Sequence, residues 1–337
     1  MRSIPQYPGA VGWDPLTLLA LCVISFVHIF LFPLYGISPK PSATRTIADF
    51  EQSLCTANLK YKKTWRRQRC PQDGIVTVQQ GGRLGNQLWE YASVWALARR
   101  TGLEPYVPRC IRQRLDQVFE TLTIPTLDEI AHCPVNLNTF VNSLEMWNYT
   151  NQSIVLPRYA VLPEVVLTWV QDIFQEFTFR KKIRDKCYHV LKSACKLANN
   201  STGCLYVGVH VRRTDYLGYL WRKHRTVLAD PRYFYTAMAY FERKYQSVVF
   251  VVISDDPIWC LQNLTRKKNV YVASKRTLSS PGQDLAIMSS CNHSIIDYGT
   301  FGVWGAILAG GETILYNVSH HSAQRVAELL PNWHILS

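Results

Sequence analysis

The spacing of apolar positions becomes regular at Gly74 and predicts a strand, a glycine loop and a helix in succession. Residues 75–79 form a β-branched run, and the glycine-rich segment Gly81–Gln87 follows at once. After Gln87, apolar side chains recur at spacings of three and four, at positions 88, 91, 92, 95, 96 and 97, which is the period of a helix. This order of elements is how an α/β unit starts.

The last third of the chain alternates apolar strand-like runs with helix-like segments. Helical periodicity is also present in Val166–Phe177 and Arg180–Ala198. Alternating strands and helices predict a doubly wound parallel sheet, which binds ligands beyond the carboxyl ends of its strands. We therefore expect an α/β fold with two lobes, 74–180 and 181–337, facing a cleft. The predicted elements are strands at 204–211, 247–253, 269–273, 293–297 and 313–316, with helices at 232–245 and 301–309.

One apolar stretch near the amino terminus differs from everything else in the chain. From Pro15 to Pro39 there is no Asp, Glu, Lys or Arg, and roughly 20 apolar residues are enough to cross a bilayer. The run is longer than the core of a cleaved signal peptide, and no small-residue cleavage pattern lies beside it. A single uncleaved anchor at 15–37 is the favoured reading over a signal peptide, with a cytosolic tail at 1–14.

Residues 38–73 are predicted to be a stem. They include six Lys or Arg residues between 60 and 69 and little periodic apolar content. In a cytosolic protein such a run suggests nucleic-acid binding. Beyond a membrane anchor we expect a solvated stem instead, and no nucleic-acid partner.

Glycosylation signals and cysteines place the region after the anchor in the secretory lumen. Nine cysteines follow Cys22, a number that suits an oxidising compartment. Because nine is odd, at least one thiol is free or pairs with another chain, and the spacing does not reveal the pairs. Seven Asn-x-Ser/Thr signals follow the anchor and none precedes it: Asn148, Asn151, Asn199, Asn200, Asn263, Asn292 and Asn317.

Composition restricts the class of protein further. The chain has 337 residues, with 37 Lys or Arg against 24 Asp or Glu, a formal charge of +13. Hydrophobic residues make up 47%, which excludes a disordered chain, and the single long apolar stretch excludes a multi-span membrane protein. No Cys-x-x-Cys pair exists, so we expect no structural zinc site.

The strongest chemical signal is the segment His210–Tyr216 at the end of a predicted buried strand. Its adjacent Arg212 and Arg213 are suited to capturing phosphate oxygens, because a guanidinium forms paired hydrogen bonds and stays charged. If side chains alternate, one arginine reaches a diphosphate while the other pairs with Asp215. The alternative is that both belong to a buried ion-pair network.

Three other segments offer weaker signals. Gly299, Thr300, Phe301 and Gly302 open a predicted helix, whose free amides form an anion site or an ordinary cap. In Gly81–Gln87, Gly82 permits close backbone approach to a ligand and Asn86 offers an amide. The spacing of its glycines does not fit a dinucleotide-binding fingerprint. Asp255-Asp256 reads as a turn that ends a strand rather than a metal site, with Asp255 touching a base or ribose at most.

Four segments in order resemble one family. The segment 210–216 looks like the HxRRxD motif of α1,2- and α1,6-fucosyltransferases. The run 81–92 is similar to the amino-terminal signature of galactoside α1,2-fucosyltransferases, glycosyltransferase family 11. Residues 250–255 fit the next block, and residues 284–311 resemble the third block. Together these matches cover most of residues 75–317.

The resemblance implies a type II Golgi membrane protein with a luminal GT-B catalytic domain. The 74–180 lobe would face the acceptor and the 181–337 lobe would bind GDP-fucose. It implies inverting transfer of fucose from GDP-β-L-fucose to the 2-hydroxyl of a terminal β-galactoside, with no obligatory metal or other cofactor. Alternative functions are a protein O-fucosyltransferase, an α1,6-type enzyme or a non-catalytic luminal lectin. The oligomeric state is left open, with a homodimer as one option.

The resemblance also implies roles for individual residues. Arg212, or else Arg213, and the amides of residues 300–302 would stabilise charge on the departing diphosphate. On family precedent, His210, Asp215 and Asp284 would support or contact the nucleotide. The acceptor hydroxyl needs a proton acceptor, for which Glu145 beside Trp147 is a candidate. The alternative for Glu145 is an ordinary surface loop position.

Overall fold

The computed structural model describes residues 46–57, 67–134, 153–198, 203–274, 280–318 and 322–336. The chain divides into two units, residues 1–45 and 46–337, and the described residues all belong to the second. Within the described ranges, no helix combines the length and apolar character needed to cross a bilayer. The predicted anchor, Glu145 and the signals at 148, 151, 199 and 200 lie outside the described residues.

The first sheet has three parallel strands in the order β2-β1-β3. They are β1 (Ile75–Val78), β2 (Glu104–Pro105) and β3 (Ile154–Leu156). Helix α3 (Leu84–Thr101) connects β1 to β2 and ends at Gly102, whose left-handed φ of 79° stops the helix. The predicted helix started after Gln87, but α3 begins at Leu84. The glycine-rich segment therefore supplies its first turn, because Arg83 is extended and serves as the N-cap.

Short helices complete this part of the chain. The helix predicted for Val166–Phe177 is interrupted, because Trp169 departs from helical backbone angles, with φ −114° and ψ 27°. The elements are α4 (Arg109–Leu115), η2 (Leu127–Ile130), α5 (Pro163–Val166), η4 (Leu167–Trp169) and α6 (Val170–Glu176).

Part of the predicted stem is folded. Helix α2 (Ile47–Leu54) is capped by Thr46, which forms a capping box with Asp49. Its side chains Ile47, Phe50 and Leu54 recur at helical spacing and are buried in a cluster with residues of β1 and β3. Helix α2 therefore packs on the first sheet, which the basic residues of the segment did not reveal.

The second sheet has six parallel strands in the order β6-β5-β4-β7-β8-β9. This confirms the predicted α/β fold with a parallel sheet, and it adds a last strand that the sequence pattern did not predict. The strands are β4 (Leu205–Val211), β5 (Val248–Ser254), β6 (Val270–Val272), β7 (His293–Ile296), β8 (Thr313–Tyr316) and β9 (Trp333–Leu336).

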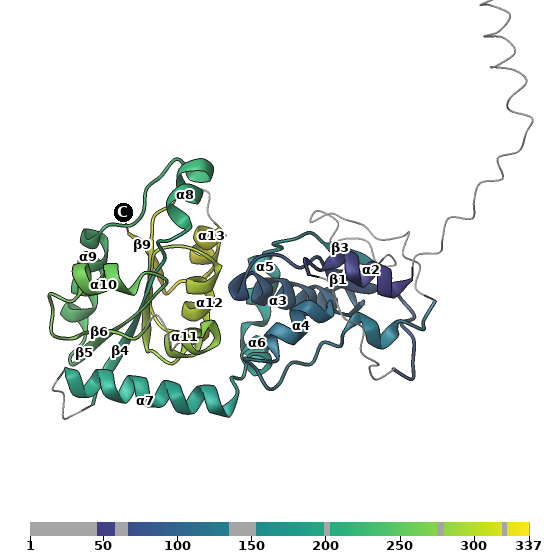
Figure 1. Cartoon of the computed structure of the whole chain (residues 1–337), viewed down its shortest axis with the longest axis horizontal. Helices are drawn as coiled ribbons and strands as arrows, with labels where there is room; N and C mark the ends of the chain where they lie inside the picture. Colours follow the sequence, from purple (N-terminus) through teal and green to yellow (C-terminus); the bar gives the residue numbers. More distant parts are fainter. Residues whose placement is uncertain are drawn as a thin grey trace, which may run out of the picture. The chain divides into compact units, whose positions relative to one another are not determined.

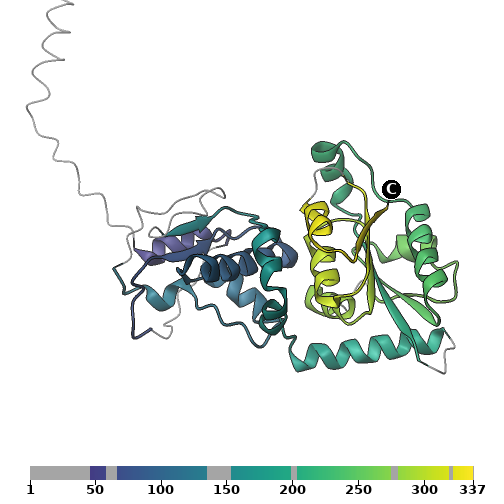
Figure 2. The ribbon, with the colours of Figure 1, turned by 180° about the vertical axis from the view of Figure 1, so that it is seen from behind.

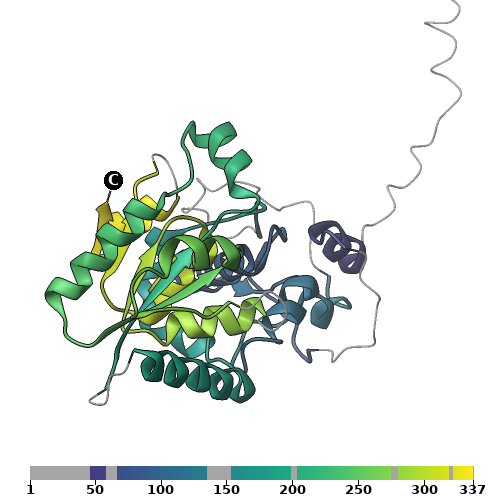
Figure 3. The same cartoon turned by 60° about the vertical axis from the view of Figure 1, so that its left-hand side comes forward.

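Helices cover both faces of this sheet (Figures 1 and 2). In β5, side chains alternate between two apolar clusters, because successive strand residues face opposite sides. One face carries α8 (Tyr216–His224), α9 (Pro231–Lys244) and α10 (Pro257–Leu264). The other carries α7 (Lys181–Leu197), α11 (Pro281–Ser289), α12 (Thr300–Ala309) and α13 (Ser322–Leu329). Figure 3 shows α7 lying beside α11.

Helices α3 and α12 join the two sheets. The ring of Trp304 lies 4.8 Å from that of Trp89 and 5.2 Å from that of Phe177, measured between centroids. At the start of both helices, a Cβ on Gly85 would stand 2.6 Å from the backbone nitrogen of Phe301. Only glycine permits this approach. The contact brings the first turns of the two helices together.

All nine cysteines after the amino-terminal apolar stretch lie in described residues. Six form three disulfides, Cys55–Cys110, Cys70–Cys133 and Cys195–Cys204. The thiols of Cys187, Cys260 and Cys291 are free and buried. The expectation of at least one unpaired thiol is confirmed. The first of them ties the end of α2 to α4, and the second ties the segment before β1 to the residues after η2.

Replacing Cys55 and Cys110 together by serine is expected to lower the free energy of unfolding by about 4 kcal/mol. The disulfide spans 55 residues, and a longer closed loop removes more entropy from the unfolded chain. The matched control is the Cys195–Cys204 pair, which spans 9 residues and is expected to cost about 3 kcal/mol. Denaturant unfolding of the full chain measures both. An equal or smaller loss for the long-range pair would contradict this ordering.

Candidate active site

The predicted site residues follow three adjacent strands. Strand β4 lies between β5 and β7, and all three run parallel. Their carboxyl ends therefore meet at one edge of the sheet. This edge gathers the segment from His210 to Asp215, the pair Asp255-Asp256 and the segment from Asp297 to Gly302.

Asp255 fixes the loop that follows β4. Its carboxylate accepts hydrogen bonds from the amides of Arg213 (2.9 Å) and Thr214 (3.3 Å) and from the Thr214 hydroxyl (2.5 Å). It also lies 2.9 Å from Nη1 of Arg212. The predicted strand-ending turn thus holds residues 212–215, called the arginine loop below, at the carboxyl end of β4. Both carboxylate oxygens of Asp255 accept hydrogen bonds from this loop.

The two arginines take different partners. Nη2 of Arg212 donates to Oδ1 of Asp215 at 2.5 Å, and the guanidinium lies 5.4 Å from the ring centroid of Tyr216. The guanidinium of Arg213 stacks 3.8 Å from the centroid of Trp259, and its Nε is 3.8 Å from Asp256. Both arginines are thus paired with carboxylates of the protein, and Asp215 pairs with Arg212, the arginine first assigned to the diphosphate. Because Asp215 is 53% exposed, this is not the buried ion-pair network of the alternative interpretation.

Three exposed or half-buried carboxylates lie near three guanidinium groups at this edge. Asp215, Asp255 and Asp256 face Arg212 and Arg213, and Arg83 supplies a third guanidinium, 3.8 Å from Asp215. The Asp215 side chain is 53% exposed, whereas that of Asp255, the other carboxylate partner of Arg212, is 20% exposed. Asp215 is therefore the partner that a dissolved anion can displace most readily.

Asp297 is a functional candidate that the sequence reasoning missed. It is 1% exposed and accepts hydrogen bonds from the amides of Arg212 (2.6 Å) and Tyr298 (2.7 Å). Its Oδ1 lies 3.1 Å from Nδ1 of His210. Burial raises the pKa of the Asp297 carboxyl, and these hydrogen bonds oppose the shift. The sequence signal that could have identified Asp297 is its position directly after the apolar strand β7.

The start of α12 lies against His210. Gly299 is its N-cap, with φ 87°, and Thr300, Phe301 and Gly302 form its first turn. A Cβ on Gly302 would stand 2.6 Å from Nδ1 of His210, so only glycine fits there. The first amides of a helix lack intrahelical partners and attract anions. The predicted anion site therefore lies next to the arginine loop.

The first sheet contributes the beginning of α3. The hydroxyl of Thr300 donates to Oδ1 of Asn86 at 3.0 Å, which joins two site residues predicted from distant parts of the sequence. Gly82 has φ 57° and directly precedes the N-cap Arg83. Asp284 is half-buried in the first turn of α11, the helix between β6 and β7.

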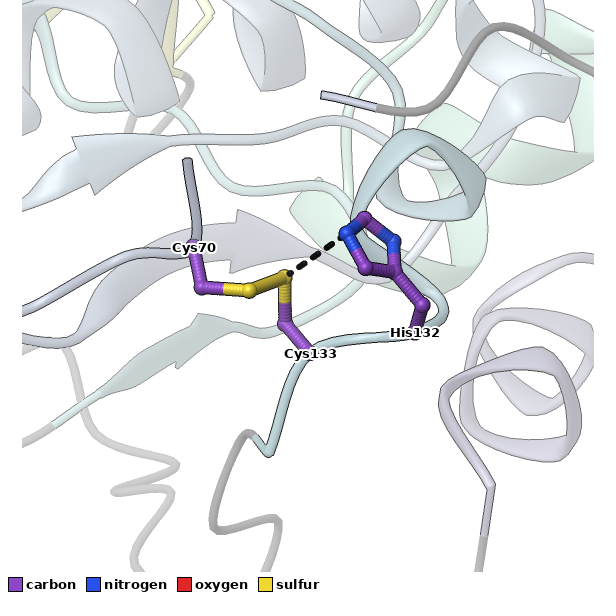
Figure 4. A group of neighbouring side chains, drawn as sticks. All are labelled: Cys70, His132 and Cys133. Carbon is purple, nitrogen blue, oxygen red and sulfur yellow. Dashed lines mark hydrogen bonds between the residues drawn. A yellow bond between two sulfur atoms is a disulfide. The ribbon is translucent and has the colours of Figure 1, made fainter. Parts of the chain in front are cut away.

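In the described ranges, one group of three metal-capable side chains gathers, comprising Cys70, His132 and Cys133. Figure 4 shows that the two cysteines form a disulfide, with Nε2 of His132 3.8 Å from Sγ of Cys133. A disulfide sulfur is not the thiolate that metals prefer. We therefore interpret the group as a structural disulfide with a neighbouring histidine. It does not belong to the arginine edge, the carboxyl edge of the second sheet where the two arginines lie.

Known proteins that are similar to this chain include two mammalian fucosyltransferases and one solved structure. A Bos taurus protein named galactoside 2-alpha-L-fucosyltransferase SEC1 is 31% identical, over 93% of this chain and 88% of its own length. The Pongo pygmaeus galactoside alpha-(1,2)-fucosyltransferase 2 is 34% identical, over 72% of this chain and 71% of its own. A crystal structure of the NodZ alpha-1,6-fucosyltransferase soaked with GDP-fucose has 16% identity and a TM-score of 0.47, covering 74% of this chain and 97% of that one.

The family match spans nearly all of the described chain. Residues 45–337 match the family described as Glycosyl transferase family 11. The match begins one residue before α2 is capped, so it includes the packed helix that the sequence pattern had assigned to a stem. Together with identities above 30% over most of two relatives, this shows that the chain is a glycosyltransferase that belongs to glycosyl transferase family 11.

Proposed function

We propose that the chain transfers fucose from GDP-β-L-fucose to the 2-hydroxyl of a terminal galactose and inverts the anomeric centre, forming an α1,2 linkage. Relatives named as galactoside α1,2-fucosyltransferases support this activity. The observation that carries it is the pairing of an arginine loop with the start of α12 at one sheet edge. We propose a GT-B arrangement, with the donor held by the second sheet.

The reaction is a single displacement. The 2-hydroxyl oxygen of galactose bonds to C1 of fucose as the bond from C1 to the phosphate oxygen breaks, and GDP leaves with the electron pair. The hydroxyl proton passes to a base. Negative charge grows on the departing diphosphate, and preorganised cations and amides lower the barrier by stabilising it.

Some residues bind the departing diphosphate, and others position the loop that carries Arg212. Arg212 exchanges Asp215 for the diphosphate, because Asp215 is the exposed partner of that pair. The first amides of α12 face the same charge. Asp255 and Asp297 hold the backbone of residues 212–214, so the guanidinium is positioned before the donor arrives. In our proposal, the Arg212 guanidinium and the first amides of α12 stabilise the diphosphate in place of a metal ion. Glu145 remains a proposed base.

We also propose that residues 15–37 anchor the chain as a single-pass type II protein in the Golgi membrane, with the family domain in the lumen. The support is the uncharged apolar stretch and the seven glycosylation signals that follow it. Of the signals in described residues, Asn292 and Asn317 are exposed, and Asn263 is half-buried.

Arg212→Ala is expected to lower kcat at least about a hundredfold, the scale of losing one transition-state donor. The exposed Arg243→Ala on α9 is the matched control and keeps wild-type turnover. Initial rates with GDP-fucose and a β-galactoside measure both. A loss below about threefold in Arg212→Ala would remove Arg212 from this role. Any shortened version used for the assay has to retain residues from 46 onward, since α2 is packed.

An acceptor panel tests the substrate. Terminal β-galactosides are expected to give a product with fucose on the 2-hydroxyl, at a rate unchanged by excess chelator. Linkage analysis by mass spectrometry identifies the product. A peptide or a chitobiose-core acceptor that outperforms galactosides would favour a protein O-fucosyltransferase or an α1,6-type enzyme. GDP binding without turnover on any acceptor would favour a lectin.

The luminal orientation has its own test. The full chain expressed in a eukaryotic cell is expected to migrate faster after enzymatic removal of N-glycans, and to stay with the membrane in alkaline carbonate. Asn292→Gln and Asn317→Gln together would reduce the mobility shift. An unchanged mobility of the wild-type chain would contradict placement of the family domain in the lumen.

A further inference from the structure

Glu90 has a buried carboxyl group that takes no part in the proposed transfer reaction. It lies on α3 one turn after Asn86 and is 0% exposed. Residues four apart on a helix share a face, so Glu90 lies on the same face of α3 as the site residue Asn86, one turn further along. Its Oε1 accepts hydrogen bonds from the amide of Gly81 at 2.7 Å and from the amide of Tyr159 at 3.1 Å.

These two amides belong to different loops. Gly81 follows β1 and Tyr159 follows β3, and the two strands pair in parallel. One carboxyl oxygen therefore ties together both loops at the carboxyl edge of the first sheet. Tyr159 has φ 65°, uncommon for a bulky residue, and its side chain is 55% exposed. The Tyr159 ring also lies close to the glycine loop, because a Cβ on Gly81 or Gly82 would stand 3.0 Å from it. The hydrogen bond to Glu90 is therefore one of the links between these loops.

The second oxygen of Glu90 differs from that of an ordinary buried carboxylate. Oε2 is buried and receives no hydrogen bond from any described residue. Glu176, equally buried in the same part of the chain, receives two donors on each oxygen, from Tyr91, Trp95 and Thr123. A buried carboxylate oxygen that carries charge without a donor is costly in the interior. The environment therefore favours the protonated form of Glu90.

Neighbouring charges do little to reverse this preference. Burial raises the pKa of Glu90 to about 8, and the two amides and the positive charge of Arg158 oppose the shift. Helix α12 and strand β1, which pack on α3, contain no titratable side chain. The charged or titratable groups on the other packed elements are Glu164 of α5, Glu104 of β2 and Arg109, Arg112 and Arg114 of α4. Glu164 pairs with Arg325, Arg109 with Asp128 and Arg112 with Asp116.

The loop held by Glu90 leads directly to the arginine edge. Gly81 is followed by Gly82 and by Arg83, the N-cap of α3, whose Nη2 lies 3.8 Å from Asp215. Asn86 in the next turn accepts the hydrogen bond from Thr300. A shift of the Gly81 backbone would therefore displace groups on both sides of the proposed donor site.

We propose that Glu90 is a positioning residue that works in its protonated form, clamping the loops after β1 and β3 so that Arg83 and Asn86 meet the donor-binding edge. This proposal rests on the proposed fucosyl transfer. Loss of the proton leaves a desolvated charge on Oε2, and the water that enters to solvate this charge would displace the two loops. Transfer should then decline in alkaline solution, although Glu90 never touches the substrate.

The test compares Glu90→Gln and Glu90→Met in the full chain, with Glu164→Gln as the matched control. Glutamine keeps an oxygen for both amides and cannot ionise, whereas methionine fills the space without accepting. For the wild type, kcat/KM for GDP-fucose is expected to fall as pH rises through about 8. Glu90→Gln keeps most of the activity at neutral pH and lacks this decline. Glu90→Met loses at least about tenfold, since misplacing a binding group by about 1 Å can cost about a hundredfold.

Unfolding measurements separate this inference from the proposed activity. The raised pKa makes the contribution of Glu90 to stability full below about pH 4.5 and lost as pH rises through about 8. Glu90→Gln is expected to remove this dependence, and Glu164→Gln to retain it. A wild type without fucosyl transfer would refute the proposed function. The unfolding data would still test whether Glu90 is protonated in the folded protein. Wild-type kcat/KM in Glu90→Met, or an unchanged alkaline decline in Glu90→Gln, would overturn the positioning role.

Discussion

Two carboxylates at the ends of neighbouring strands hold the backbone on which the rest of the site depends. Asp255 after β5 binds the amides of Arg213 and Thr214, and Asp297 after β7 binds the amide of Arg212. Because β4 lies between these strands, its following loop is restrained from both sides. The arginines are therefore fixed through their main chain, which leaves the Arg212 guanidinium able to exchange its exposed partner for a ligand.

The second constraint is the close approach of two helix starts. Gly85 lets the first turn of α3 approach the backbone of α12, and Trp304 packs against Trp89 further along the same helices. Residues more than two hundred positions apart, Asn86 and Thr300, can thus share a hydrogen bond. The apolar contact provides stability, and the glycine contact sets the distance at which polar groups of both sheets face one another.

The sequence pattern predicted much of this arrangement. Strand-ending positions correctly brought His210, Arg212, Asp255 and Gly299 to one edge, because parallel strands align their carboxyl ends. The pattern did not reveal Asp297 or Glu90, since the importance of a buried carboxyl depends on which distant amides reach it. Helix α2 was missed because eight residues with three buried apolar side chains give too short a periodic signal.

The central claim concerns where the leaving group is bound. A crystal structure of the full chain with GDP tests it most directly. We expect the diphosphate between the Arg212 guanidinium and the first amides of α12, with the Arg212–Asp215 contact broken and the Asp255 and Asp297 contacts to the loop retained. GDP bound away from both elements, with Arg212 still paired to Asp215, would contradict the account.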